Sequence, residues 1–174
     1  MYSMSITLLQ TVHGSHLYGL STPESDVDTY TVISNNIFKK KATFAHQSII
    51  GDQDTFVADL STFLKQCDEG VPQALEAMFS TQANVDHIKT FRRRYRPNVA
   101  NAIKTYNRTI DNFLFRGDAK GRVHAVRLTL NLYDLVQSGR FDPTLGEGDQ
   151  QTVMINSKTP ESAAGFISLF KTIL

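Results

Sequence analysis

A short segment near the N-terminus combines a glycine turn with two closely spaced carboxylates. Gly14-Ser15 directly follows an apolar run at residues 5–12, and Asp26 and Asp28 stand two apart in a second run rich in β-branched and aromatic residues. Glycine lets a backbone approach an anion closely, and exposed N–H groups with a serine hydroxyl can bind phosphate oxygens. Two carboxylates on one face of a strand can bind Mg²⁺ or Mn²⁺ between them. This combination predicts metal-assisted phosphoryl or nucleotidyl transfer.

The apolar periodicity predicts strands in the first half of the chain and helices in the second. Strands are expected at residues 5–12, 26–34, 43–50 and 55–59, with a helical turn at 16–20 and a solvated bend at Lys39-Lys40-Lys41. Helices are expected to begin near residues 60 and 72, and to continue at 99–114, 123–136 and after Thr159-Pro160. Residues 141–157 are rich in Gly, Asp and Gln without periodicity, which predicts an exposed loop.

Length and composition favour a folded soluble protein. The chain has 174 residues, of which 41% are hydrophobic and 20% charged, as is usual for globular domains. The single cysteine, Cys67, excludes an intrachain disulfide framework and a cysteine-based zinc site. No apolar run is long enough to span a membrane, and no signal peptide is evident. We therefore expect a cytoplasmic protein with no membrane partner.

The net charge of +1 conceals an uneven distribution along the chain. Residues 1–88 contain four lysines and no arginine against ten acids, a net charge of −6, whereas residues 89–174 contain fourteen bases and seven acids, a net charge of +7. Such asymmetry predicts two domains at these boundaries, one that gathers metal cations and one that meets phosphates. Chance placement of surface charge is the alternative.

The motif at residues 14–28 carries a family resemblance. Gly14-Ser15 followed by Ser25-Asp26-Val27-Asp28 resembles the signature of the DNA polymerase β-like nucleotidyltransferase superfamily. With Tyr18-Gly19 it is similar to a bacterial and phage group described as predicted nucleotidyltransferases, whose later proline–glutamate and His-x-x-Arg-Leu helices resemble residues 72–80 and 122–128. The resemblance extends over about residues 5–145 and is strong only at 14–28.

The resemblance implies both a fold and an activity. The fold is α+β, with a small mixed β-sheet flanked by helices as the catalytic core (residues 1–88) and a mostly helical C-terminal lobe (residues 89–174). The activity is transfer of a nucleoside monophosphate from an NTP, expected to be ATP, to an acceptor hydroxyl, with two Mg²⁺ (or Mn²⁺) ions bound and pyrophosphate released. If the chain is phage-encoded, its compartment is the host cytoplasm.

The resemblance also assigns roles to individual residues. Gly14, Ser15 and Ser25 bind the nucleotide, and Asp26 and Asp28 are catalytic metal ligands. The superfamily usually has a third acid on a later strand, for which Asp59 is the first choice, as a metal ligand or general base. Asp59 also stands where a helix N-cap is expected. The alternatives for the third acid are Glu76 and Asp54.

Basic residues of the second half are candidates for phosphate binding. His124 and Arg127 share a predicted helix face, and with Arg122 nearby they are placed to reach the nucleotide phosphates or the acceptor. Structural packing of His124 is the alternative.

Two further groups of residues have competing interpretations. The run Arg92-Arg93-Arg94-Tyr95-Arg96 suits a phosphate backbone with a stacked base, but also a solvated helix start or ion pairs with the acidic half. His13 and His16 flank the glycine turn and are spaced as a metal pair, yet with a single cysteine in the chain and no further spaced ligands a zinc site is not expected.

The sequence leaves the acceptor open among nucleic acid, protein and small molecule, and leaves the oligomeric state open. An alternative function is a catalytically inactive nucleotide- or nucleic-acid-binding module of the same fold. A special case of the enzyme is a modifier that attaches AMP to a partner protein.

Overall fold

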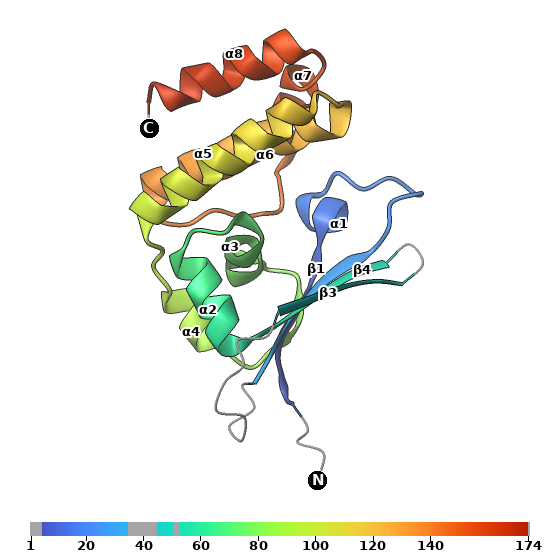
Figure 1. Cartoon of the computed structure of the whole chain (residues 1–174), viewed down its shortest axis with the longest axis vertical. Coiled ribbons are helices and arrows are strands. Elements are labelled where there is room, and N and C mark those ends of the chain that lie inside the picture. The colour runs from blue at the N-terminus through green and yellow to red at the C-terminus, as the bar shows by residue number, and fades with distance from the viewer. Residues whose placement is uncertain (1–4, 35–44, 51–52, 174) are drawn as a thin grey trace.

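The computed structural model describes residues 5–34, 45–50 and 53–173, and shows a β-sheet covered by helices (Figure 1). The described residues form five strands, β1 (Thr7–His13), β2 (Asp28–Ile33), β3 (Ala45–Ile50), β4 (Gln53–Asp59) and β5 (Ala83–Asp86). They also form eight helices, α1 (Gly14–Tyr18), α2 (Leu60–Asp68), α3 (Pro72–Phe79), α4 (Lys89–Arg94), α5 (Val99–Arg116), α6 (Ala119–Ser138), α7 (Glu147–Asn156) and α8 (Pro160–Lys171). The predicted bend at Lys39-Lys40-Lys41 lies outside the described residues.

The sheet is mixed, with strand order β3-β4-β2-β1-β5. β2 and β4 run parallel, and the other neighbouring pairs are antiparallel. His13 pairs with Asp28 in the β1–β2 register, and Thr29 pairs with Thr55 in the β2–β4 register. The end of β1 and the beginnings of β2 and β4 therefore meet at one end of the sheet, which we call the Asp28 edge.

One hydrophobic core joins the sheet to the helices. Its buried residues include Leu9 and Tyr30 from the strands, Met78 from α3, Tyr106 from α5 and Leu128 from α6. The residues predicted to form two domains, 1–88 and 89–174, thus share this core. α5 and α6 pack side by side, and α8 packs against α6 (Figure 1). In the described part of the chain, no helix combines the length and apolar character needed to cross a bilayer.

The predicted α+β class and most of the predicted elements are confirmed. The last helix begins as the sequence predicts, with Thr159 as N-cap in a capping box and Pro160 in the first turn. The second strand begins at Asp28 rather than at residue 26. The predicted loop at 141–157 is wrong in part because α7 occupies most of it. α7 buries only Val153, so its sequence carries almost no apolar periodicity.

Candidate active site

The Asp28 edge brings two carboxylates together from neighbouring parallel strands. Because Thr29 pairs with Thr55, Asp28 and Asp54 lie one position earlier on the two strands. The backbone N–H of Asp54 donates a hydrogen bond of 3.4 Å to Asp28 Oδ1. Sequence reasoning ranked Asp54 behind Asp59, whereas the strand register places Asp54 next to Asp28.

Among the described residues, one oxygen of the Asp54 carboxylate accepts a hydrogen bond and the other has no partner. Its Oδ2 accepts a hydrogen bond of 2.5 Å from Gln47 Nε2. Its Oδ1 is buried and has no hydrogen-bond partner among the described residues. A buried carboxylate oxygen without a partner is costly, and a cation bound there would remove that cost. Two carboxylates at the edge of a sheet are the hard oxygen donors that Mg²⁺ and Mn²⁺ prefer.

The protein ligands for such a cation are few. Residues 5–34, 45–50 and 53–173 contain no group of three or more His, Cys, Asp or Glu side chains arranged to hold a metal ion. Mg²⁺ is usually bound by one or two carboxylates together with waters and substrate phosphates. The Asp28–Asp54 pair fits Mg²⁺ binding of this kind, in which two carboxylates share the ion with waters and substrate phosphates.

Gly14 lies directly against the Asp28 carboxylate. Its φ angle is +65°, and a Cβ atom on this residue would stand 2.4 Å from Asp28 Oδ2. Only glycine fits both the backbone conformation and the space. Gly14 begins α1, and the half-buried Ser15 follows it. The turn that the sequence assigns to phosphate binding therefore contacts one of the predicted metal ligands.

The loop before β2 holds Ser25 and Asp26. The Ser25 hydroxyl accepts a hydrogen bond of 2.8 Å from the N–H of Thr22, and its carbonyl lies 3.1 Å from His16 Nε2. The Ser25 side chain thus closes a turn of the loop rather than pointing to the glycine turn. Asp26 is exposed and precedes the strand. The prediction that the strand begins at residue 26 is therefore wrong, because β2 begins at Asp28.

Asp59 lies far from the Asp28 edge. The β2–β4 register pairs it with Ile33, five residues along the strand from Asp28. At 3.3 Å per residue this separation is about 16 Å. Asp59 Oδ1 accepts hydrogen bonds from the Thr62 N–H at 2.7 Å and the Ser61 hydroxyl at 3.0 Å, and so caps α2. The prediction of Asp59 as the third catalytic acid and metal ligand is not supported by this geometry.

Glu76, the other alternative for the third acid, is at the centre of a buried polar cluster. Its side chain is fully buried on α3. Oε1 accepts a hydrogen bond of 2.6 Å from Arg127 Nη1, and Oε2 accepts one of 2.8 Å from the Tyr18 hydroxyl. The Arg127 guanidinium carbon lies 3.5 Å from the centroid of the Tyr18 ring. His13 Nδ1 lies 3.8 Å from Glu76 Oε2. Glu76 therefore connects β1 and α1, at the Asp28 edge, to α6.

Burial determines the charge states around this cluster. Desolvation lowers the pKa of His13, and the nearby Glu76 carboxylate only partly opposes it. Burial disfavours the charged form of Arg127, but Glu76, Tyr18 and Tyr106 together outweigh that effect, so the pKa of Arg127 is raised. Burial raises the pKa of Tyr18 well above its ordinary value. The cluster is thus a paired Glu⁻–Arg⁺ with neutral neighbours.

The three basic residues predicted to reach phosphates have structural partners. Arg127 is 3% exposed and is paired with Glu76. Arg122 donates hydrogen bonds to the carbonyls of Ser157 at 2.9 Å and Gly117 at 3.0 Å. His124 stacks on the Phe113 ring at 4.9 Å between centroids, and burial lowers its pKa to about 4. Helix periodicity placed His124 and Arg127 on one face, and that face packs inside the protein. The acid Glu76 within the otherwise apolar segment 74–79 was the available signal for a buried ion pair.

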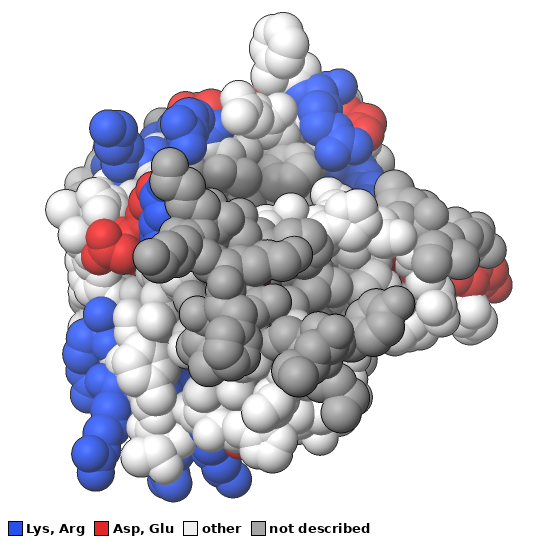
Figure 2. Space-filling model, turned by 60° about the horizontal axis from the view of Figure 1, so that its bottom comes forward, with Lys and Arg blue, Asp and Glu red and all other residues white. Residues whose placement is uncertain are grey.

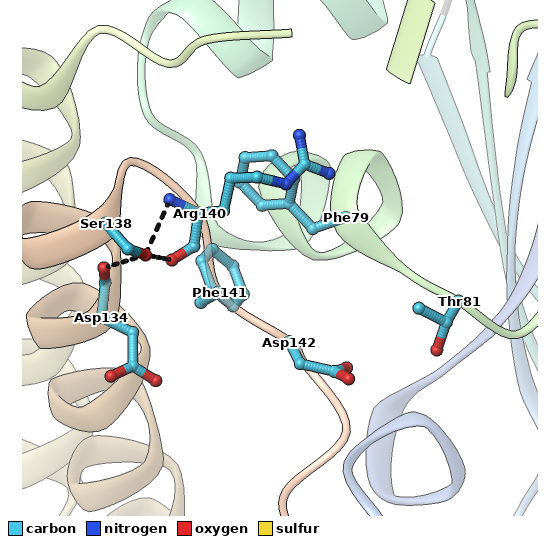
Figure 3. Close-up of a pocket in the computed structure, with 7 residues that line it drawn as sticks. All are labelled: Phe79, Thr81, Asp134, Ser138, Arg140, Phe141 and Asp142. Atoms are coloured by element: carbon cyan, nitrogen blue, oxygen red, sulfur yellow. Dashed lines mark hydrogen bonds between the residues drawn. The ribbon is translucent and has the colours of Figure 1, made fainter. Parts of the chain in front are cut away.

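A pocket of about 420 Å³ lies between the C-terminal end of α6 with the segment that follows it and the C-terminal end of α3 (Figure 3). Two residues close in sequence to the pocket lining are hydrogen-bonded to α1. Gln82 Nε2 donates a hydrogen bond of 3.2 Å to the Leu17 carbonyl, and the Leu145 N–H donates one of 3.1 Å to the Tyr18 carbonyl. The pocket lining combines aromatic rings, hydroxyls, carboxylates and one guanidinium, from Phe79, Thr81, Asp134, Ser138, Arg140, Phe141 and Asp142. In Figure 3 the Asp142 side chain extends toward Thr81.

No protein-family model matches the chain, and no curated protein sequence matches it.

Proposed function

We propose that the protein is a Mg²⁺- or Mn²⁺-dependent nucleotidyltransferase that moves a nucleoside monophosphate from an NTP to an acceptor hydroxyl and releases pyrophosphate. One observation carries the proposal: Asp28 and Asp54 lie side by side at the edge of a parallel strand pair, with Gly14 against Asp28. A glycine turn that contacts a carboxylate pair is what binding of a metal–triphosphate complex requires.

The residues of the Asp28 edge have distinct roles in this proposal. Asp28 and the unpartnered Asp54 Oδ1 bind the cation, which when bound neutralises charge on the triphosphate. The backbone at Gly14 and the Ser15 hydroxyl hold phosphate oxygens beside it. Asp26, exposed two residues before Asp28, is a further candidate ligand. ATP is the proposed nucleotide, as the family resemblance implies.

The pocket at the C-terminal ends of α3 and α6 is the proposed place for the acceptor. The segments next to it are hydrogen-bonded to Leu17 and Tyr18 at the C-terminal end of α1, whereas Gly14 at the other end contacts Asp28. The Asp142 carboxylate and the Thr81 hydroxyl offer oxygens to an acceptor that carries hydrogen-bond donors. Its size lies within the usual range for small-molecule sites.

Nucleotide binding and transfer test the proposal directly. We expect a non-hydrolysable ATP analogue to bind by calorimetry in the presence of Mg²⁺ and to lose most of its affinity when EDTA is added. Transfer of label from α-³²P-ATP to nucleic acid, protein or small-molecule acceptors measures turnover. Asp28→Asn and Asp54→Asn should abolish both signals, and Asp111→Asn, on the outer face of α5, is the matched control. Wild-type behaviour in both Asp28→Asn and Asp54→Asn would refute the proposal.

The alternative function is a catalytically inactive nucleotide- or nucleic-acid-binding module. The observation that favours it is the lack of a third clustered ligand among the described residues. The same calorimetry separates the two functions. Nucleotide binding that is indifferent to EDTA, with no transfer of label, would favour the inactive module. Transfer of label to a protein acceptor would identify the special case of a protein modifier.

A further inference from the structure

A short basic segment, formed by α4 and the two residues after it, lies on the protein surface at residues 89–96. Four of its cationic side chains are exposed. In the part of the chain that the structure describes, none of the four pairs with a carboxylate. They are Lys89, Arg93, Arg94 and Arg96. Ion pairs with described residues of the acidic half, which the sequence left open, therefore do not account for these four cations.

Arg92, the remaining cation of this segment, anchors it. Its side chain is 6% exposed and forms an ion pair with Asp86. It also donates hydrogen bonds to the carbonyls of Met78 at 3.0 Å, Ala77 at 3.1 Å, and Ser80. One arginine thus fixes α4 to α3 and β5, and the other cations are left at the surface.

An aromatic side chain is exposed among these cations. Phe91, on the same segment as the four cations, is 45% exposed. Its ring lies 6.0 Å from the half-buried Tyr95 ring, which supports it from one side. Exposed cations and an exposed aromatic ring in one short segment are a combination that can bind single-stranded nucleic acid, because phosphates meet the charges and a base stacks on the ring.

Arg140 adds to the positive charge beside α4. Its Nη1 donates hydrogen bonds of 3.3 Å to the carbonyls of both Arg92 and Arg93, and its guanidinium carbon lies 4.6 Å from the Phe79 ring centroid. Burial, and then the charges of Arg96 and Arg92, lower the pKa of Arg140. Positive charge is therefore concentrated beside α4. Figure 2 shows that Lys and Arg side chains lie in several separate groups around the margin of one face of the molecule.

We propose that residues 89–96 bind single-stranded nucleic acid, with phosphates at Lys89, Arg93, Arg94 and Arg96 and one base stacked on Phe91. The surface is separate from the Asp28 edge, whereas Arg140, which contacts α4, also lines the pocket proposed for the acceptor. Asp86, at the end of β5, pairs with Leu9, which is four residues from His13 along β1. This distance is about 13 Å at 3.3 Å per residue. The surface would hold a nucleic acid away from the Asp28 edge, and its binding does not depend on nucleotidyl transfer.

Fluorescence anisotropy with fluorescein-labelled 20-nucleotide oligo(U) and oligo(dT) tests the proposal on the full chain. We expect binding at 50 mM NaCl and a slope of log K against log salt concentration of about −3, since each of four phosphate contacts contributes about −0.7. Arg93→Glu with Arg94→Glu should weaken binding at least tenfold and flatten the slope. Phe91→Ala, which removes an exposed side chain, should weaken it by about fivefold to a hundredfold.

The matched control reverses two exposed cations on another helix. Lys104→Glu with Arg108→Glu, on α5, makes the same change in net charge and should leave affinity within about twofold. Circular dichroism melting of each variant confirms that it is folded. Asp54→Asn should bind the oligonucleotides as the wild type does, which keeps this test independent of the proposed enzyme.

Three outcomes would overturn the proposal. The first is absence of binding by the wild type at 50 mM NaCl. The second is equal loss of binding in the α4 and α5 double variants, which would indicate attraction by net charge alone. The third is displacement of the oligonucleotide by an equal concentration of poly-glutamate, which would indicate an acidic protein as the partner.

Discussion

The Asp28 carboxylate occupies the space in which a side chain on Gly14 would stand, with Oδ2 only 2.4 Å from the position of that Cβ atom. The glycine turn and the strand that carries the carboxylate are therefore fitted to each other. Any side chain at position 14 must displace Asp28, and a displaced Asp28 no longer lies beside Asp54.

Gly14→Ala should destabilise the fold and weaken Mg²⁺-dependent nucleotide binding by at least tenfold. The positive φ of +65° alone costs about 1 kcal/mol for alanine. Gly139→Ala is the matched control, because Gly139 has a φ of +74° and nothing within 4 Å of its added Cβ. Urea unfolding should show a loss of stability in both variants. Calorimetry should show the loss of nucleotide binding only in Gly14→Ala, and equal binding by both would contradict the role of the contact.

Asp59→Ala should affect stability and leave the Mg²⁺ dependence of nucleotide binding unchanged. Asp59 caps α2 through its bond with the Thr62 N–H, and removal of such a cap costs about 1 kcal/mol. Chemical denaturation measures the first effect and calorimetry the second. Asp59→Asn, which retains a capping oxygen, should recover most of the stability. Loss of Mg²⁺-dependent binding in a folded Asp59→Asn would restore Asp59 as a candidate ligand.

Arg127→Met should destabilise the protein by about 3–5 kcal/mol, because it leaves the buried Glu76 carboxylate without its cation. Glu76→Gln combined with Arg127→Met should be more stable than Arg127→Met alone. The double variant buries no charge at these two positions, and the amide oxygen of the introduced glutamine can still accept from the Tyr18 hydroxyl. Urea midpoints of the wild type, both single variants and the double variant provide this comparison. A double variant less stable than Arg127→Met would refute the ion-pair account.

Acidification should destabilise the protein partly through His124. Its pKa is about 4 in the folded protein, below the usual value near 6.5, mainly because burial disfavours the charged ring. Between pH 6.5 and 4 the unfolded chain binds a proton there that the folded protein does not, so stability falls as pH falls through this window. His124→Gln should reduce the difference in urea stability between pH 7 and pH 4.5. An unchanged difference would show that other groups dominate.

Local patterns predicted much of the fold. The apolar repeats of α2, α3, α5 and α6 and the cap of α8 are local features, because they depend on residues within a few positions of one another. The sequence did not predict β5 and α7, because neither element has a strong local pattern. β5 has only four residues, and α7 buries only Val153, so neither carries a clear periodic signal.

One part of the candidate site could be predicted from the sequence, and its second carboxylate could not. Gly14, Ser15 and Asp28 lie within one short segment, so their residue types and spacing were enough to predict a phosphate turn beside a carboxylate. The second carboxylate depends on which strand lies beside β2 and in which register. Asp54 and Asp59 stand at opposite ends of the same strand, and only the pairing of Thr29 with Thr55 brings Asp54 to Asp28. The roles of the arginines likewise depended on packing, since Arg127 and Arg92 are buried by helices and strands that no local pattern identifies as their neighbours.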